Sequence, residues 1–285
     1  MTLFLKRSVM TSFPEELFVL IRVHMRTDEL YALALVCRRW YGETHGCVHT
    51  LKARSSRRLT CVPCTHFTRL TELHLCDSHS PVTDRHLQQL PQLRFLDLRC
   101  TRNISDAGLS TLTQLRALDL RGNDRISGEA VARLTTLTQL LLCHKTRVGN
   151  RAVRALTSLT CLSLRENPRI SDTTLRTLTC MQKLSLDGNA LITDSALQCL
   201  TQLTDLSLWA NDKITDEALR PLVNLTRLNL RRNEAIRGTY LTRMTGLTDL
   251  SLDTGFEWSR GAGIREISFF RLCREKLMNA LSGDV

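Results

Sequence analysis

The sequence has no long apolar run. None of its apolar stretches approaches the roughly 18 residues that a membrane span requires. A secretory signal places its charges first and then about 7–15 apolar residues. Here a short apolar patch from Leu3 to Leu5 precedes Lys6 and Arg7 instead. We therefore expect a protein that does not associate with membranes and stays inside the cell, in the cytoplasm, the nucleus or both.

The sequence also lacks a disulfide pattern and a catalytic or metal-binding motif. Its 11 cysteines are an odd number, and most are expected at repeated apolar positions, where a reduced cysteine packs as a small hydrophobe. Cys61 and Cys64, with His66 nearby, do not supply the two paired ligand sets of a structural zinc site. The eight histidines share no spacing. We expect no catalytic residue, no metal and no cofactor, and hence no enzymatic activity in this chain.

Lysine is scarce as well. The formal net charge is +11, and the basic residues are 33 Arg and 6 Lys. A basic protein can bind nucleic acid. Here, however, the arginines are dispersed along the chain, and so strong a skew can reflect the coding genome. The charge alone therefore does not predict a nucleic-acid partner.

An internal repeat dominates what the sequence does contain. The pattern Leu-x-x-Leu-x-Leu, once with Met first, begins at Leu70, Leu93, Leu115, Leu137, Leu159, Met181, Leu203, Leu225 and Leu247. Each step is 22 residues except the first, which is 23 and has its extra residue around 79–81. Asn recurs at position nine, Ile or Val at position twelve, and apolar residues at positions seventeen and twenty. Nine matches in one register identify a leucine-rich repeat.

Each part of the repeat predicts a local structure. The leucines alternate with period two, so they face inward from a short parallel strand while the residues between them face outward. The Asn amide both donates and accepts, and is expected to satisfy backbone groups where the chain leaves the strand. A short helix should follow, carrying positions seventeen and twenty. Its predicted N-caps, each followed by Asp, are Ser105, Ser171, Thr193 and Thr215.

Since no repeat can bury its own apolar face, the repeats are expected to stack into a solenoid. A degenerate unit at 48–69 precedes the repeats proper at 70–260, with no linker before it. Beyond these, Ile264 to Leu281 has the spacing of an amphipathic helix. Residues 261–285 are therefore expected to form a capping helix and tail. A helix that binds a partner is the alternative.

The segment before the repeats has a pattern of its own. After a tail at 1–12, residues 13–47 begin FPEELFVLIRVHMRTDELYALALVCRRW. Pro14 suits the first position of a helix, Thr27 marks the start of a second, and Cys37 begins or continues a third. Three short helices in so few residues would gain stability by packing on the first repeat and on a partner.

This segment resembles the F-box, whose pattern is Leu-Pro-x-Glu-Leu, an apolar pair, Asp/Glu-Leu and Val-Cys-x-x-Trp. The matching residues, at the family's spacing, are Pro14, Glu16, Leu17, Ile21, Leu30, Val36, Cys37, Arg39 and Trp40. Phe13 replaces the usual Leu, and Arg22 stands where a second large apolar residue is common. The stem of Arg22 can still cover apolar surface.

An F-box followed by these repeats is similar to the F-box proteins of the leucine-rich class. The resemblance implies an α/β fold: a leucine-rich-repeat solenoid, shaped as a right-handed horseshoe with parallel strands on its concave face and short helices on its convex face, preceded by a small three-helix F-box. It implies that the F-box docks on the SCF adaptor, which bridges to the cullin and RING subunits of a ubiquitin ligase. The adaptor-binding residues would be Phe13, Pro14, Leu17, Ile21, Leu30, Val36, Cys37 and Trp40.

The repeats of such a subunit would hold an unidentified protein substrate close to the conjugating enzyme and raise its effective concentration there. On the concave face, outward positions three, five and seven would contact it. Arg and Trp are the residue types that most often dominate protein–protein affinity. Together with one aromatic at position three, they give the predicted substrate-binding residues Phe95, Arg99, Arg121, Arg165, Trp209 and Arg231.

An acidic or phosphorylated segment would suit this strip of arginines, although nearby aspartates neutralise part of its charge. Two other interpretations stay open. The repeats can serve as an interaction scaffold, or as an effector that hijacks a host's ligase, without a ubiquitination substrate of their own. A nucleic-acid-binding repeat protein would instead gather its basic residues on one face and lose binding steeply with salt.

Overall fold

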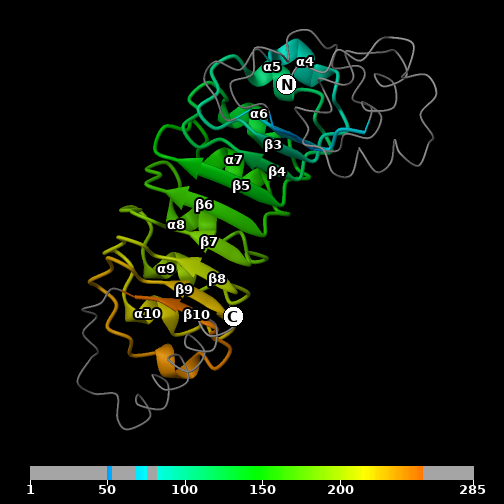
Figure 1. Cartoon of the computed structure of the whole chain (residues 1–285). Helices are drawn as coiled ribbons and strands as arrows, with labels where there is room; N and C mark the ends of the chain where they lie inside the picture. Colours follow the sequence, from blue (N-terminus) through cyan, green and yellow to red (C-terminus); the bar gives the residue numbers. More distant parts are fainter. Residues whose placement is uncertain (1–49, 53–68, 76–81, 253–285) are drawn as a thin grey trace, which may run out of the picture. The chain divides into compact units, whose positions relative to one another are not determined.

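The computed structural model describes residues 50–52, 69–75 and 82–252. The predicted F-box at 13–47, most of the degenerate repeat at 48–69 and the predicted capping helix at 264–281 lie outside these residues. The chain divides into two compact units, Met1–Leu115 and Arg116–Val285. The described residues of each unit form the repeat identified above (Figure 1).

The described part of the first unit contains three parallel strands and two helices. The strands are β1 (Thr50–Lys52), β2 (Glu72–His74) and β3 (Phe95–Asp97), and the helices are α4 (Asp84–Gln88) and α5 (Asp106–Leu109). Leu73 lies opposite Leu51 in one neighbour and opposite Leu96 in the other. These offsets equal the spacings of the sequence pattern, so the extra residue of the first step lies outside the strands.

The second unit repeats the same strand–turn–helix arrangement. Its strands are β4 (Ala117–Asp119), β5 (Gln139–Cys143), β6 (Cys161–Arg165), β7 (Lys183–Ser185), β8 (Asp205–Ser207), β9 (Arg227–Asn229) and β10 (Asp249–Ser251). Its helices are α6 (Gly128–Ala132), α7 (Asn150–Ala155), α8 (Asp172–Leu175), α9 (Asp194–Leu197), α10 (Asp216–Leu219) and the 3₁₀ helix η4 (Leu241–Arg243). The strands pair in parallel in chain order, and the helices cover one face of the sheet (Figure 1). The predicted leucine-rich-repeat solenoid is confirmed.

The core consists of the apolar positions that recur in the sequence. In the repeat that contains β6 and α8, less than 3% of the surface of each such residue is exposed: Leu159, Leu162, Leu164, Ile170, Leu175 and Leu178. Met181 is as fully buried as the Leu it replaces. Burying one side chain of this size contributes about 1.5–3 kcal/mol, so stacking supplies most of the driving force for folding.

The helices are shorter than the sequence pattern predicts. Helix α8 ends at Leu175, and its C-cap is Arg176. Leu178, at position twenty, lies beyond the helix in a tight turn in which its N–H donates to the carbonyl of Leu175. The same turn recurs at Leu200 with Leu197. A repeat of this length leaves room for little more than one helical turn, so the residue at position twenty reaches the core from a turn instead.

The asparagines at position nine form a buried ladder between repeats. The Oδ1 atom of Asn189 accepts from the N–H groups of Leu191 (2.9 Å) and Ile192 (3.0 Å). Its Nδ2 atom donates to the carbonyls of Leu164 (3.0 Å) and Asn167 (2.9 Å) in the preceding repeat. The predicted role at the end of the strand is therefore confirmed, and the amide also ties neighbouring repeats together.

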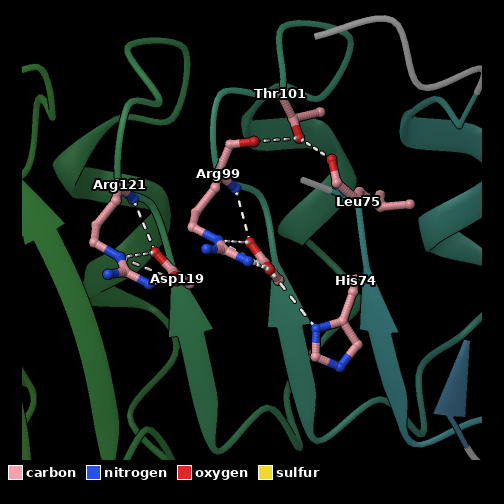
Figure 2. Close-up of polar contacts among 7 residues, drawn as sticks. His74, Leu75, Arg99, Thr101, Asp119 and Arg121 are labelled. Carbon is pink, nitrogen blue, oxygen red and sulfur yellow. Dashed lines mark hydrogen bonds and ion pairs between the residues drawn. The ribbon is translucent and has the colours of Figure 1, made fainter. Parts of the chain in front are cut away.

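Threonine replaces asparagine where a repeat lacks it. Thr146 is 1% exposed, and its hydroxyl donates to the carbonyl of Cys143 (2.8 Å) and accepts from Asn167 Nδ2 (3.3 Å). In the first unit the hydroxyl of Thr101 donates to the carbonyl of Leu75 (2.7 Å; Figure 2). The ladder therefore requires a buried polar side chain of the right reach rather than asparagine itself.

A second ladder runs along the helix side. Asp172, the first residue of α8, accepts from the backbone N–H of Thr193 (2.9 Å) and the hydroxyl of Ser195 (2.7 Å) in the next repeat. Asp194 accepts in the same way from the N–H (2.7 Å) and hydroxyl (2.6 Å) of Thr215. Burial disfavours the Asp172 carboxylate, but these hydrogen bonds outweigh it and hold its pKa below the ordinary value.

The predicted N-caps occupy the cap position in every case, but only some use the side chain as a cap. The hydroxyls of Ser105 and Thr215 accept from N–H groups of their own helices. Those of Ser171 and Thr193 do not. The Thr193 hydroxyl donates to Asp172 of the preceding repeat instead. At that position the coupling between repeats replaces the local cap that the sequence predicted.

Candidate binding surface

The strand face carries the predicted substrate-binding residues. Phe95 opens β3 and is half-buried, and Arg99 follows the same strand in the first unit. In the second unit Arg165 ends β6, while Arg121, Trp209 and Arg231 lie two residues beyond β4, β8 and β9. All of these arginines and the tryptophan share position seven of the repeat. Their binding role stays a prediction, and their surroundings differ strongly.

Arg99 in the first unit is bound to an aspartate at the end of the strand that precedes it. Its Nε donates to both oxygens of Asp97 (3.0 and 3.1 Å) and a terminal nitrogen donates to Oδ2 (2.8 Å; Figure 2). The backbone N–H of Arg99 donates to the same carboxylate (3.0 Å). The side chain of Asp97 is 2% exposed and that of Arg99 is 42% exposed. The carboxylate is thus buried beneath a guanidinium that caps it.

The Asp97 carboxylate stays ionised because of this cap. Burial disfavours the charged form, but the hydrogen bonds from Arg99 outweigh that effect and lower the pKa of Asp97. His74 Nδ1 lies 3.7 Å from Asp97 Oδ2 (Figure 2). The His74 ring also packs against Phe95, with ring centroids 4.6 Å apart. Phe95 therefore contributes to a polar cluster with an aromatic edge rather than to an isolated apolar patch.

The second unit contains the same fork at β4. Arg121 Nε donates to both oxygens of Asp119 (3.0 and 3.2 Å), and its terminal nitrogen donates to Oδ2 (2.7 Å). Figure 2 shows the two forks formed alike. An arginine that already has a buried carboxylate offers little net charge to a ligand. The sequence predicted that these aspartates neutralise part of the arginine charge. In the structure Arg99 and Arg121 each form several hydrogen bonds to one aspartate.

Trp209 lies between basic residues of two other repeats. The Arg165 guanidinium carbon lies 5.6 Å from the centroid of the Trp209 ring, and that of Arg232 lies 5.4 Å away. Both distances are within the range of a cation–π interaction. The tryptophan itself is half-buried. Its backbone N–H donates to Asp187 Oδ1 (3.2 Å), which fixes the strand exit beneath the ring.

Other strand-face residues, which the sequence did not single out, complete this region. Arg227 forms an exposed ion pair with Asp205 of the neighbouring strand (2.6 Å). The two residues share position three in successive repeats, so the 22-residue spacing could have revealed the pair.

Among the described residues Arg231 has no acidic partner for its guanidinium, and its backbone N–H donates to Asn229 Oδ1 (3.2 Å). Arg231 is thus the position-seven arginine with the least compensated charge.

The residue after position seven turns the chain off the strand in a left-handed conformation. Its φ is +72° at Gly122 and +58° at Gly188, but also +52° at Glu166 and +50° at Ala210. A Cβ on Gly188 would lie 3.1 Å from Cγ of Glu166 in the preceding repeat. Both φ and the close approach of Glu166 therefore favour glycine at 188. Nothing in the repeat pattern flagged this position.

The described cysteines correct one expectation. Cys143 is buried and its sulfur accepts from the N–H of Gly122 (3.0 Å). Burial raises the pKa of the Cys161 thiol. Cys100, Cys180 and Cys199 are exposed, however, so the expectation that most cysteines fill core positions is wrong for the described set. These three stand at solvent-facing positions adjacent to core positions.

No metal-binding cluster is found within the described part of the chain, where no three His, Cys, Asp or Glu side chains gather closely enough to hold an ion. Cys61 and Cys64 lie outside that part. A search for bilayer-spanning helices in the described ranges also finds no candidate with enough length and hydropathy.

Comparison with known proteins identifies the repeat. The family model described as "Leucine Rich repeat" matches residues 89–113 and 111–134. In the solved TLR13–ssRNA13 complex, a chain superposes with a TM-score of 0.57 at 24% identity, over 75% of this chain and 33% of that one. This chain therefore spans a third of that protein's length, and the likeness concerns the fold alone.

Two further solved structures align less closely. An internalin from Listeria monocytogenes gives a TM-score of 0.44 at 20% identity, over 74% of this chain and 84% of that chain. A chain of the yeast Rad7 and Elc1 complex gives a TM-score of 0.47 at 17% identity, over 72% and 70%. No curated protein sequence matches this chain. The family model shows that the chain contains leucine-rich repeats.

Proposed function

We propose that this protein is the substrate-recognition subunit of an SCF-type cullin-RING ubiquitin ligase, acting in the cytoplasm, the nucleus or both. The observation that carries the proposal is the F-box pattern of residues 13–40 placed directly before leucine-rich repeats. The repeats are present in the structure, and the F-box segment lies outside the described residues. The proposal therefore combines an F-box pattern, which comes from the sequence, with leucine-rich repeats, which are present in the structure.

The adaptor half of the proposal depends on the apolar residues of the F-box. Leu17 and Ile21 stand on one stripe of the first predicted helix, and Val36 and Trp40 follow at the end of the motif. Burying such side chains against an adaptor would supply most of the affinity. Arg22 lowers the apolar area of the same helix, so we expect a weaker adaptor contact than a large apolar residue would give there.

The substrate half depends on the strand face. Hydrogen bonds between repeats, such as those of Asn189 and Asp172, hold the strands and turns in fixed positions. A rigid surface loses little conformational entropy when it binds. The strand-face residues best suited to dominate affinity for a protein are Trp209 with Arg165, and Arg231 with its uncompensated charge. The subunit would act by positioning the substrate, so the chain itself needs no catalytic group and no cofactor.

The alternative is an interaction scaffold, or an effector that hijacks a host's ligase, without a ubiquitination substrate of its own. Both possibilities use the same strand face and the same F-box. They differ in the fate of the bound protein: a receptor shortens its lifetime, and a scaffold does not.

The adaptor contact can be tested with purified full-length protein. The double variant Leu17→Asp/Ile21→Asp places two charges on the predicted adaptor-binding stripe, and we expect it to lose at least about tenfold in adaptor affinity in a calorimetric or interferometric titration. Val223→Asp is the matched control, because Val223 is an exposed apolar residue (52%) on the repeats. Adaptor affinity that is the same for both variants and the wild type would reject the F-box assignment.

A further inference from the structure

Five residues at position eleven of successive repeats form a row on the turns between strands and helices of the second unit. We name this the turn row; its members are Arg125, Arg147, Arg169, Leu191 and Lys213. Every member is exposed. Repeats in a parallel sheet are about 4.8 Å apart, so neighbouring members of the row recur at about that distance. The repeat pattern did not include this position, although Arg recurs there in three successive repeats.

The backbone of the turn row is fixed by the buried asparagine ladder. The Asn side-chain oxygen at position nine accepts from the N–H of Arg125 (2.9 Å), Arg169 (2.9 Å) and Lys213 (3.0 Å). It accepts from Leu191 in the same way (2.9 Å). Arg147 forms a parallel bridge with Ser127 of the preceding repeat. The row is therefore pre-organised although it lies on turns, which lowers the entropy lost on binding.

In the described part of the chain, three arginines of the turn row lack the acidic partner that Arg99, Arg121 and Arg227 have on the strand face. Arg99 and Arg121 face buried aspartates, and Arg227 faces Asp205. Among the described residues, by contrast, no acidic side chain pairs with Arg125, Arg147 or Arg169. Positive charge without an acidic partner is therefore offered on the turns, as it is at Arg231 on the strand face.

Few carboxylates stand near these three arginines. In the turns at 122–126, 144–148 and 166–170 the acidic residues are Asp124 and Glu166, against Arg125, Lys145, Arg147 and Arg169. Glu166 is already engaged, since it lies 3.5 Å from both Arg165 Nε and His144 Nδ1. A ligand that approaches this edge meets a net positive field.

We propose that the turn row binds an acidic helical segment of a partner protein. One turn of α-helix rises 5.4 Å, close to the spacing of the repeats, so carboxylates on successive turns of one helical face can each meet an arginine. Leu191 continues the row with an apolar side chain that is 44% exposed. A polynucleotide presents phosphates along its whole backbone, whereas a helix can place a leucine after its glutamates. The row therefore fits a protein better than a nucleic acid.

This inference rests on the proposed protein-binding role of the repeats but is independent of adaptor binding. It refines where an acidic partner binds: at the turn row, next to Arg165, rather than over the paired arginines of the strand face. A partner held there would leave much of the strand face available for a second contact.

The test uses full-length protein and a fluorescein-labelled helical peptide with Glu on three successive turns of one face and Leu on the fourth. The oligonucleotide dT4, whose three phosphates match the three Glu side chains in charge, serves as the second probe. The triple variant Arg125→Gln/Arg147→Gln/Arg169→Gln is expected to lose about tenfold or more in peptide affinity at 0.1 M salt, by fluorescence anisotropy. Leu191→Ser is expected to lose about threefold for the peptide and nothing for the oligonucleotide.

The matched control removes the same charge elsewhere. Arg133→Gln/Arg176→Gln/Arg220→Gln replaces three exposed arginines at the C-caps of α6, α8 and α10. We expect it to change peptide affinity less than twofold. Equal losses in the two triple variants, no saturable peptide binding, or tighter binding of dT4 than of the peptide would each overturn the proposal. Adaptor affinity should be unchanged in every one of these variants, so failure here is distinct from failure of the F-box assignment.

Discussion

The aspartates of the strand face and those of the helix side have different roles. On the strand face, Asp97 and Asp119 each end a strand and bind the arginine two residues further along the chain. On the helix side, Asp172 and Asp194 accept from the following repeat. Strand-face pairs thus shape the surface within one repeat, whereas helix-side aspartates couple neighbouring repeats. The coupling leaves the residues of the strand face and the turn row free to vary with function.

The largest effect is expected where coupling between repeats is buried. Asn189→Ala would remove buried hydrogen bonds to two backbone N–H groups and two carbonyls, and should lower the free energy of unfolding by about 2–4 kcal/mol. Urea denaturation followed by circular dichroism measures it. Asn224→Ala is the control, since Asn224 makes one exposed hydrogen bond to the preceding repeat (3.0 Å) and should cost less than about 1 kcal/mol. Similar losses in both variants would mean that burial of the ladder does not matter.

The strand-face pairs predict the next effect. Arg99→Gln removes the partner of the buried Asp97 carboxylate and should destabilise the protein by about 1–3 kcal/mol. The pKa of Asp97 should rise in this variant, as a pH titration by NMR would show. Arg227→Gln breaks the exposed pair with Asp205, where we expect less than about 1 kcal/mol. If both variants lost the same stability, the distinction between capped and exposed pairs would fail.

The helix-side coupling predicts a smaller, pH-dependent effect. Because the folded state lowers the pKa of Asp172, its contribution is present above the unfolded value of about 4 and is lost as pH falls through the folded pKa. Asp172→Asn should therefore cost about 1 kcal/mol at pH 7, discounted for partial solvent screening, and progressively less below pH 4. Urea titrations at pH 7, 5 and 3 measure this. A difference from wild type that persists undiminished at pH 3 would contradict the proposed charge coupling.

The sequence is most informative wherever one repeat predicts the next. The 22-residue period located the strands, the core and the asparagine ladder, since each depends on a side chain that recurs in register. The period could not locate the contacts that long side chains make with side chains of other repeats. The Trp209 ring between Arg165 and Arg232 joins residues 44 and 23 positions apart, and only the structure brings them together.

The same limit explains the corrected details. Thr193 looks like a helix cap by itself, but its hydroxyl donates to Asp172 of the preceding repeat. The turn row escapes the repeat pattern because position eleven holds either basic or apolar residues. Its significance comes from the asparagine bonds that fix it, such as that to Arg169, and from the pairing that neutralises Arg99 and Arg121 elsewhere.

The central claim is that one chain joins a ligase-binding F-box to substrate-binding repeats. The most direct measurement compares cells that express the wild type with cells that express Leu17→Asp/Ile21→Asp, quantifying by mass spectrometry the cullin that co-isolates and the half-life of proteins labelled in proximity to the chain. The account predicts that the variant loses the cullin, retains the proteins bound through its repeats, and lengthens the half-life of at least one of them. Undiminished cullin, or unchanged half-lives for every retained protein, would contradict it.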